Sequence, residues 1–151
     1  MFNFLFNNSN IIEKADFEDI KYAIKNQTNI YLINTLPHNE QDILIKNTVH
    51  SNSEEETINN LLNSFYYDIS NIIIIVYGKN TNDNNIEKKY HQLKKLGFQK
   101  VYIYYGGMFE WALLNELYGD DEFPTTQKIR DILKFKSSRS AIVHKYKMLT
   151  Y

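Results

Sequence analysis

Three apolar runs rich in β-branched residues occur along the chain, at residues 30–33, 71–77 and 100–104. Apolar side chains at consecutive positions are typical of strands that are buried on both faces of a parallel sheet. Three shorter apolar pieces are also predicted as strands, at residues 11–13, 43–45 and 48–49. The sheet is therefore expected to hold at least three central strands with short strands beside them.

Segments with helical periodicity alternate with these runs. Phe17, Ile20 and Ile24 share one helical face that ends near residue 25, and Asp16 with Asp19 predicts a capping box at its start. Four further helices are predicted, at residues 51–67, 84–96, 106–118 and 127–133. Alternation of strands and helices predicts an α/β fold, doubly wound, with a mostly parallel central sheet and helices on both faces.

Two of these helices carry specific expectations. Ser51 or Ser53 is expected to cap the acidic first turn of the 51–67 helix. Its buried face is predicted to consist of Ile58, Leu61, Leu62 and Phe65. Thr125 or Thr126 is expected to cap the 127–133 helix.

Composition limits the functional classes. The chain has 151 residues, 43% of them hydrophobic, which predicts one packed domain. Its net charge of −1 predicts no strong attraction for nucleic acid or a membrane surface. No window approaches the roughly 20 apolar residues of a membrane span, so a cytoplasmic location is expected. Heavy use of Asn, Ile, Lys and Tyr suits an AT-rich genome, such as that of a protist or a large DNA virus, and a viral protein could be virion-associated.

Two absences narrow the chemistry further. The sequence contains no cysteine, which excludes disulfides, thiolate zinc sites and a thiol nucleophile. The four histidines show neither an i, i+4 pair nor an acidic ligand motif, and they are His38, His50, His91 and His144. We therefore predict no metal site and no cofactor.

The central segment resembles the rhodanese-like (sulfurtransferase) family. The resemblance rests on a strand, a six-residue loop at 78–83, a helix, Gly97-Phe98, a second strand, and Gly106-Gly107 followed by Glu110-Trp111. It predicts a rhodanese-like domain over residues 11–122. Residues 1–10 are expected to form an N-terminal edge segment, and residues 123–151 a helix and basic tail that pack on the domain.

The same resemblance locates three departures in the family's active site. Members of the family begin the loop with the catalytic cysteine, where this chain has Gly78. Asn34 and Leu36 stand where the family has aspartate and arginine. Sulfur transfer by this loop needs a thiolate, so we expect a catalytically inactive domain, a pseudoenzyme, that serves as a binding or scaffold module for an unidentified protein.

The loop nevertheless lies at the carboxyl end of a strand, where open α/β sheets bind their ligands. Its backbone amides could bind an anion weakly beside the following helix. Lys79 is expected to be solvated, Thr81 to hydrogen-bond the loop backbone or cap the helix, and Asp83 to lie at the helix start. The site expected to have lost its chemistry consists of Gly78, Lys79, Asn80, Thr81, Asn82 and Asp83.

Alternatives remain open from the sequence. The loop could support an enzyme with non-thiol chemistry on an anionic substrate, or the protein could be a structural component of a virion. Residues 134–151 carry five basic residues and no acidic one, whereas residues 1–133 sum to −6. This tail is expected either to lie against its own domain or to contact a polyanion or partner. In the first case the anchors are expected to be Ile142, Val143, Met148, Leu149 and Tyr151.

Overall fold

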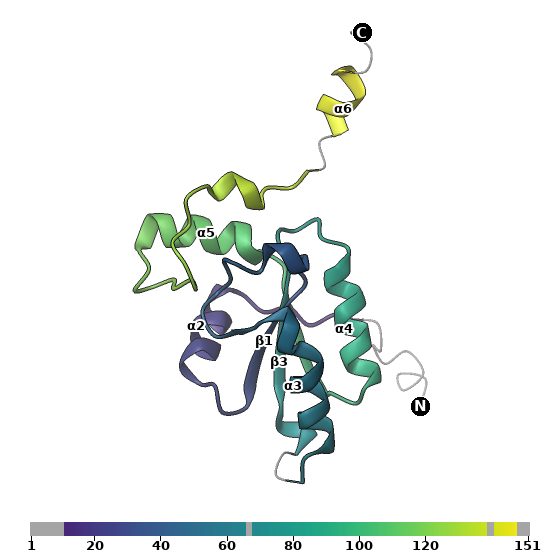
Figure 1. Ribbon diagram of the computed structural model, residues 1–151. Helices are drawn as coiled ribbons and strands as arrows, with labels where there is room; N and C mark the ends of the chain where they lie inside the picture. The colour runs from purple at the N-terminus through teal and green to yellow at the C-terminus, as the bar shows by residue number, and fades with distance from the viewer. Residues whose placement is uncertain (1–10, 66–67, 139–140, 148–151) are drawn as a thin grey trace.

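The computed structural model describes residues 11–65, 68–138 and 141–147, and a four-stranded parallel sheet lies at the centre of this part (Figure 1). The strands are β1 (Ile30–Asn34), β2 (Thr48–Val49), β3 (Ile73–Tyr77) and β4 (Lys100–Tyr104). Their order is β2-β1-β3-β4, and every pairing is parallel. The predicted fold class, a doubly wound α/β sheet, is confirmed.

A further extended segment runs beside β4. Lys14 forms an isolated parallel bridge with Ile103, and Ile103 N–H donates to the Glu13 carbonyl at 3.0 Å. The strand predicted at residues 11–13 thus pairs slightly later in the chain, around Lys14. This segment covers the outer edge of β4 where it passes.

Helices cover both faces of the sheet. One face carries α2 (Phe17–Lys25) and α5 (Gly107–Tyr118), and the other carries α3 (Ser51–Asn63) and α4 (Asn85–Lys95). Side chains of β3 alternate between the two cores, with Ile75 and Tyr77 on the α2/α5 side and Ile74 and Val76 on the α3/α4 side. The uninterrupted apolar run in β3 is therefore explained by burial on both faces.

The helix ends confirm one prediction and correct another. Asp16 accepts hydrogen bonds from the backbone of Glu18 and Asp19, and Asp19 returns the capping-box bond. For α3 the capping side chain is His50, which accepts from Asn52 N–H, rather than Ser51 or Ser53. Since α3 ends at Asn63, before the predicted end, Phe65 lies outside it and is fully exposed.

The segment after α5 differs most from expectation. No helix forms at residues 127–133; instead Thr126 exchanges backbone and side-chain hydrogen bonds with Leu44. Beside that contact, Ile45 pairs with Thr125 in an isolated antiparallel bridge. The remaining short elements are η1 (His38–Glu40), η2 (Ile69–Asn71), η3 (Ile132–Phe135) and α6 (Ala141–Lys147).

Helix α6 stands apart from the domain body in Figure 1. Ile142 and Val143, expected to anchor the tail on its own domain, are exposed, so the expected anchoring through these two side chains is not observed. The other expected anchors, at positions 148, 149 and 151, lie outside the described residues. Within the described part, no helix has the length and apolar character needed to cross a bilayer.

Candidate functional site: the loop after β3

The loop at residues 78–83 begins where β3 ends, beside the end of β1. Asn34 is in register with Tyr77, and Thr35 N–H donates to the Tyr77 carbonyl at 3.0 Å. Carboxyl ends of neighbouring parallel strands form the usual ligand site of such folds. The sheet therefore brings Gly78 and Thr35 together at the place where a family active site is expected.

The space in front of Gly78 is already filled. A β-carbon on Gly78 would lie 2.8 Å from Ile86 Cγ1 and closer still to the Asp83 carboxylate oxygen Oδ2. That carboxylate is fixed at both oxygens, because Thr35 Oγ1 donates to Oδ2 at 2.7 Å and Asn85 N–H donates to Oδ1 at 2.9 Å. The loop thus places its own anionic group where a side chain on residue 78 would begin.

The N-terminus of α5 is also used by this loop. Met108 N–H donates to the Gly78 carbonyl at 2.9 Å, and Phe109 N–H donates to the Lys79 carbonyl at 3.0 Å. Gly107 makes this approach feasible: its φ is +63°, and a β-carbon there would collide with the Gly78 carbonyl oxygen. These two amides are consequently not available to an external anion.

The segment at residues 132–138, here called the strap, closes the loop from outside. Asn80 is nearly buried and donates from Nδ2 to the Phe135 carbonyl at 3.1 Å. Asn82 Nδ2 donates to Ser137 Oγ, while the Phe135 side chain is buried in the core. The loop and the strap are therefore held together by hydrogen bonds at two points and anchored by one aromatic ring.

The remaining loop side chains divide between paired and exposed. Lys79 was expected to be solvated, but its Nζ pairs with the Glu40 carboxylate at 3.0 Å. Asp83 does lie at the start of α4, as expected. The exposed Thr81 side chain has no hydrogen-bond partner among the described residues, so its predicted capping role is not observed.

Asn34 and Leu36, the other positions that depart from the family pattern, are structural here. Asn34 is buried, accepts from Leu36 N–H and Gln41 Nε2, and donates to the Val49 carbonyl and Gln41 Oε1. An aspartate could not make the two donated bonds. Leu36 is buried in the core on the α2/α5 side, where an arginine would lose hydration.

Tyr77 connects the end of β3 to β2. Its hydroxyl contacts Thr48 Oγ1 at 2.7 Å and accepts from Ile45 N–H at 3.2 Å. Complete burial raises the pKa of Tyr77 far above the usual tyrosine value. Tyr77 is therefore a neutral side chain that links the end of β3 to Thr48 and Ile45, rather than an acid or base.

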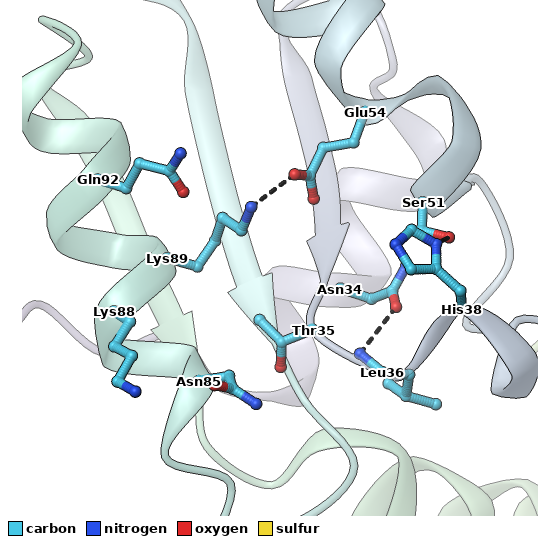
Figure 2. Close-up of a pocket in the computed structure, with 10 residues that line it drawn as sticks. All are labelled: Asn34, Thr35, Leu36, His38, Ser51, Glu54, Asn85, Lys88, Lys89 and Gln92. Atoms are coloured by element: carbon cyan, nitrogen blue, oxygen red, sulfur yellow. Dashed lines mark hydrogen bonds and ion pairs between the residues drawn. The ribbon is translucent and has the colours of Figure 1, made fainter.

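Two adjoining pockets lie beside the closed loop. One, of about 440 Å³, is lined by Lys79, Asn80, Asp83 and the strap serines Ser137 and Ser138, among others. The second, of about 320 Å³, lies between α3 and α4. Figure 2 shows Glu54 of α3 and Lys89 of α4 pointing toward one another across it, and their charged atoms are 2.6 Å apart.

The second pocket also contains a pair that sequence reasoning missed. His38 Nδ1 and Ser51 Oγ are 2.9 Å apart, although thirteen positions separate the two residues. In the described part of the chain no third group hydrogen-bonds the other ring nitrogen of His38. No local spacing could have revealed the pair, because it forms only when η1 folds against the start of α3.

The described residues contain no cluster of three or more side chains suited to hold a metal ion. Two carboxylates near the loop could in principle bind a metal ion, those of Asp83 and Glu40. Asp83 already accepts a hydrogen bond from Thr35, and Glu40 is ion-paired with Lys79. The loop is therefore an arrangement of internal hydrogen bonds and one ion pair, with an aqueous pocket on either side of Thr35.

These features define an α/β protein with its site region at the carboxyl edge of a parallel sheet. The family profile described as "Rhodanese-like domain" matches residues 13–114, which is well over half of the chain. This protein belongs to the rhodanese-like domain family. A search of curated proteins found no match.

Solved structures agree on the fold. The Alr3790 protein from Anabaena sp. is 17% identical with a TM-score of 0.50, over 89% of this chain and 91% of that one. The BH2092 protein from Bacillus halodurans is 15% identical with a TM-score of 0.54, over 89% of each chain. A full-length protein from Lactobacillus plantarum is 14% identical with a TM-score of 0.53, over 76% of this chain and 88% of that one. At these identities the likeness concerns the fold alone.

Proposed function

We propose that this chain is a catalytically inactive rhodanese-like domain that acts as a binding or scaffold module. The observation that carries the proposal is the space at Gly78, which holds the Asp83 carboxylate and the Ile86 side chain. A persulfide site needs a thiolate with room around it and electropositive surroundings. This loop supplies a fixed negative charge instead, and the strap covers it.

Sulfur transfer from thiosulfate to cyanide tests the inactive half of the proposal. We expect the purified protein to give the rate of buffer alone. Gly78→Cys should also form no persulfide, detectable as the mass of one added sulfur atom, because the neighbouring carboxylate crowds the thiol and disfavours its deprotonation. Turnover by the natural sequence would refute the proposal.

A second variant shows whether the carboxylate is the obstacle. In Gly78→Cys combined with Asp83→Ala, the oxygen nearest the new β-carbon is gone, and persulfide should accumulate. Asp83→Ala alone is the matched control and should stay inert. If the double variant also stays inert, then a further obstacle remains, either the Ile86 side chain, whose Cγ1 lies 2.8 Å from the new β-carbon, or the backbone of the loop.

The binding half rests on the two pockets beside the loop. Ionic and hydrogen-bonding side chains line both of them, which suits recognition of a polar segment of another protein. Capture experiments should compare Lys88→Glu, which changes an exposed pocket residue, with Lys95→Glu, an equal charge change elsewhere on α4. A partner retained by the second variant and lost by the first would support this surface; equal loss or equal retention would not. Whether the protein is cytoplasmic or virion-associated stays a prediction.

A second candidate function has one observation in its favour. A serine hydroxyl within hydrogen-bond reach of an imidazole is the minimum for nucleophilic ester hydrolysis, and His38 with Ser51 provides it. The catalytic alternative predicts that an activated ester is cleaved and that Ser51→Ala abolishes the cleavage. If cleavage is absent, or unchanged in Ser51→Ala, the pair is a structural contact between η1 and α3.

A further inference from the structure

Helix α5 is apolar on its outer side as well as on its inner side. Met108, Trp111 and Ala112 are fully buried against the sheet. Leu113 and Leu117, four residues apart, lie on the opposite side. Phe109, one turn before them, is half-buried against the core, and Tyr118 packs on Phe123 on the same side of the helix as Trp111. A helix that is apolar all round is normally covered all round.

This second side, here called the α5 outer face, has little cover in a single copy. Leu113 is 41% and Leu117 74% exposed. Large apolar side chains gathered on one helix face, rather than scattered singly, mark an interaction surface. The surface lies away from both pockets beside the loop, which are lined by none of these residues.

The stretch of chain that forms and follows α5 is acidic. Between Gly106 and Lys128 the chain has five acidic residues and no basic one, namely Glu110, Glu116, Asp120, Asp121 and Glu122. Glu122 is paired with Lys21, whose Nζ lies 2.7 Å from its carboxylate. An apolar strip with an acidic rim fits a partner that presents apolar side chains between basic ones.

The C-terminal segment of this chain has that complementary pattern. Within α6, Ile142 is 73%, Val143 48% and Tyr146 56% exposed, and Lys145 lies between them in sequence. Residues 134–151 carry five basic residues and no acidic one. One of these, Lys134, is already paired with Asp42 at 3.6 Å, so the positive charge that can oppose the acidic residues comes from the rest of the tail.

The course of the strap directs α6 away from its own α5. Ser137 is hydrogen-bonded to the loop, whose carbonyls bind the first turn of α5. Leu117 lies about 14 Å further along that helix. The five residues from Ser137 to Ile142 span at most ~17 Å when fully extended, so this segment would have to be nearly extended for Ile142 to reach Leu117 of its own chain.

We propose that α6 of one copy docks on the α5 outer face of a second copy, in a two-fold symmetric dimer with two identical α6–α5 contacts. Such an isologous arrangement buries both apolar strips and pairs each basic tail with an acidic rim. It does not depend on whether the loop is inactive.

Sedimentation velocity of the full chain over a range of concentrations tests the proposal. We expect a monomer–dimer equilibrium that weakens as salt rises, since screening reduces the attraction between exposed charges. Leu117→Lys should raise the dissociation constant about tenfold or more. Leu96→Lys, at the exposed leucine just after α4 on the other side of the sheet, should leave it unchanged.

A charge exchange distinguishes contact between copies from contact within one. Glu116→Lys and Lys145→Glu should each weaken the homodimer about threefold. Mixing the two variants should restore dimers, because the altered α5 of one protein then meets the altered tail of the other. A monomer at all concentrations, or a dimer insensitive to Leu117→Lys, overturns the proposal. So does a monomer in which Leu117→Lys exposes α6 to hydrogen exchange, since the tail would then cover its own domain.

Discussion

The loop at residues 78–83 and the α5 outer face are two surfaces of opposite character. At the loop, Gly78, Asn80 and Asp83 all have partners within the chain. On the α5 outer face, Leu113 and Leu117 are exposed. At the family's active-site position the polar groups thus have hydrogen-bond partners within the chain. The exposed apolar surface lies instead on the outer side of the neighbouring helix α5.

This difference bears on how the domain keeps its fold without the family's cysteine. Removing a nucleophile leaves polar backbone groups at the strand ends, and buried polar groups need partners. Here the partners are supplied by Asp83, by the first turn of α5 and by the strap. A loop closed in this way stabilises the domain, and under the proposed function recognition falls to the pockets beside it and to exposed faces.

The largest expected effect comes from disrupting the contact between α5 and the closed loop at residues 78–83. In Gly107→Ala, the methyl group would meet the Gly78 carbonyl in a backbone conformation with φ of +63°. Left-handed strain and loss of the Met108 and Phe109 hydrogen bonds should lower the free energy of unfolding by about 3–4 kcal/mol. Urea unfolding followed by circular dichroism measures this.

Gly119→Ala is the matched control for that variant. Gly119 also has a positive φ, of +94°, but a β-carbon there meets nothing within 4 Å. Only the conformational part, about 1–2 kcal/mol, should be lost. Equal losses in the two variants would mean that the close approach of α5 to the loop adds no stability.

A smaller effect is expected from returning the family's residue to the end of β1. Asn34→Asp removes the donor to the Val49 carbonyl and places a carboxylate against Gln41 Oε1. Leaving these buried acceptors without a donor should cost about 2–3 kcal/mol. Asn84→Asp, the same change at an exposed residue whose side chain makes no capping bond, should change the unfolding free energy by less than about 0.5 kcal/mol. If the two variants are equally stable, the Asn34 network is not required.

The framework around these positions was predictable because its signals are local. Consecutive apolar residues identified β3, and the capping residue Asp16 identified the start of α2. Gly106-Gly107 before Trp111 located the start of α5 through the family resemblance. Each of these features depends on residues within one or two turns of each other in the sequence.

The closure of the loop was not predictable for the opposite reason. Asn80 reaches Phe135 across 55 positions, and Asn82 reaches Ser137 across the same separation. The region before the strap was wrongly predicted as a helix because Thr126 resembles an N-cap, yet its hydroxyl and backbone bind Leu44. Side-chain hydrogen bonds between distant segments leave no periodic pattern in the sequence. They depend on how the segments pack in three dimensions, so they could not be predicted from the sequence.

The smallest expected effect on stability concerns the α5 outer face. Leu117→Ala should change the free energy of unfolding by less than about 0.5 kcal/mol when measured at concentrations too low for dimers, because the side chain is largely exposed. Met108→Ala, on the buried side of the same helix, should cost about 2–5 kcal/mol. A Leu117→Ala cost close to that of Met108→Ala would show that the α5 outer face packs within its own domain. A negligible cost, together with weakened association of Leu117→Lys, would mean that these leucines act between molecules and not in folding.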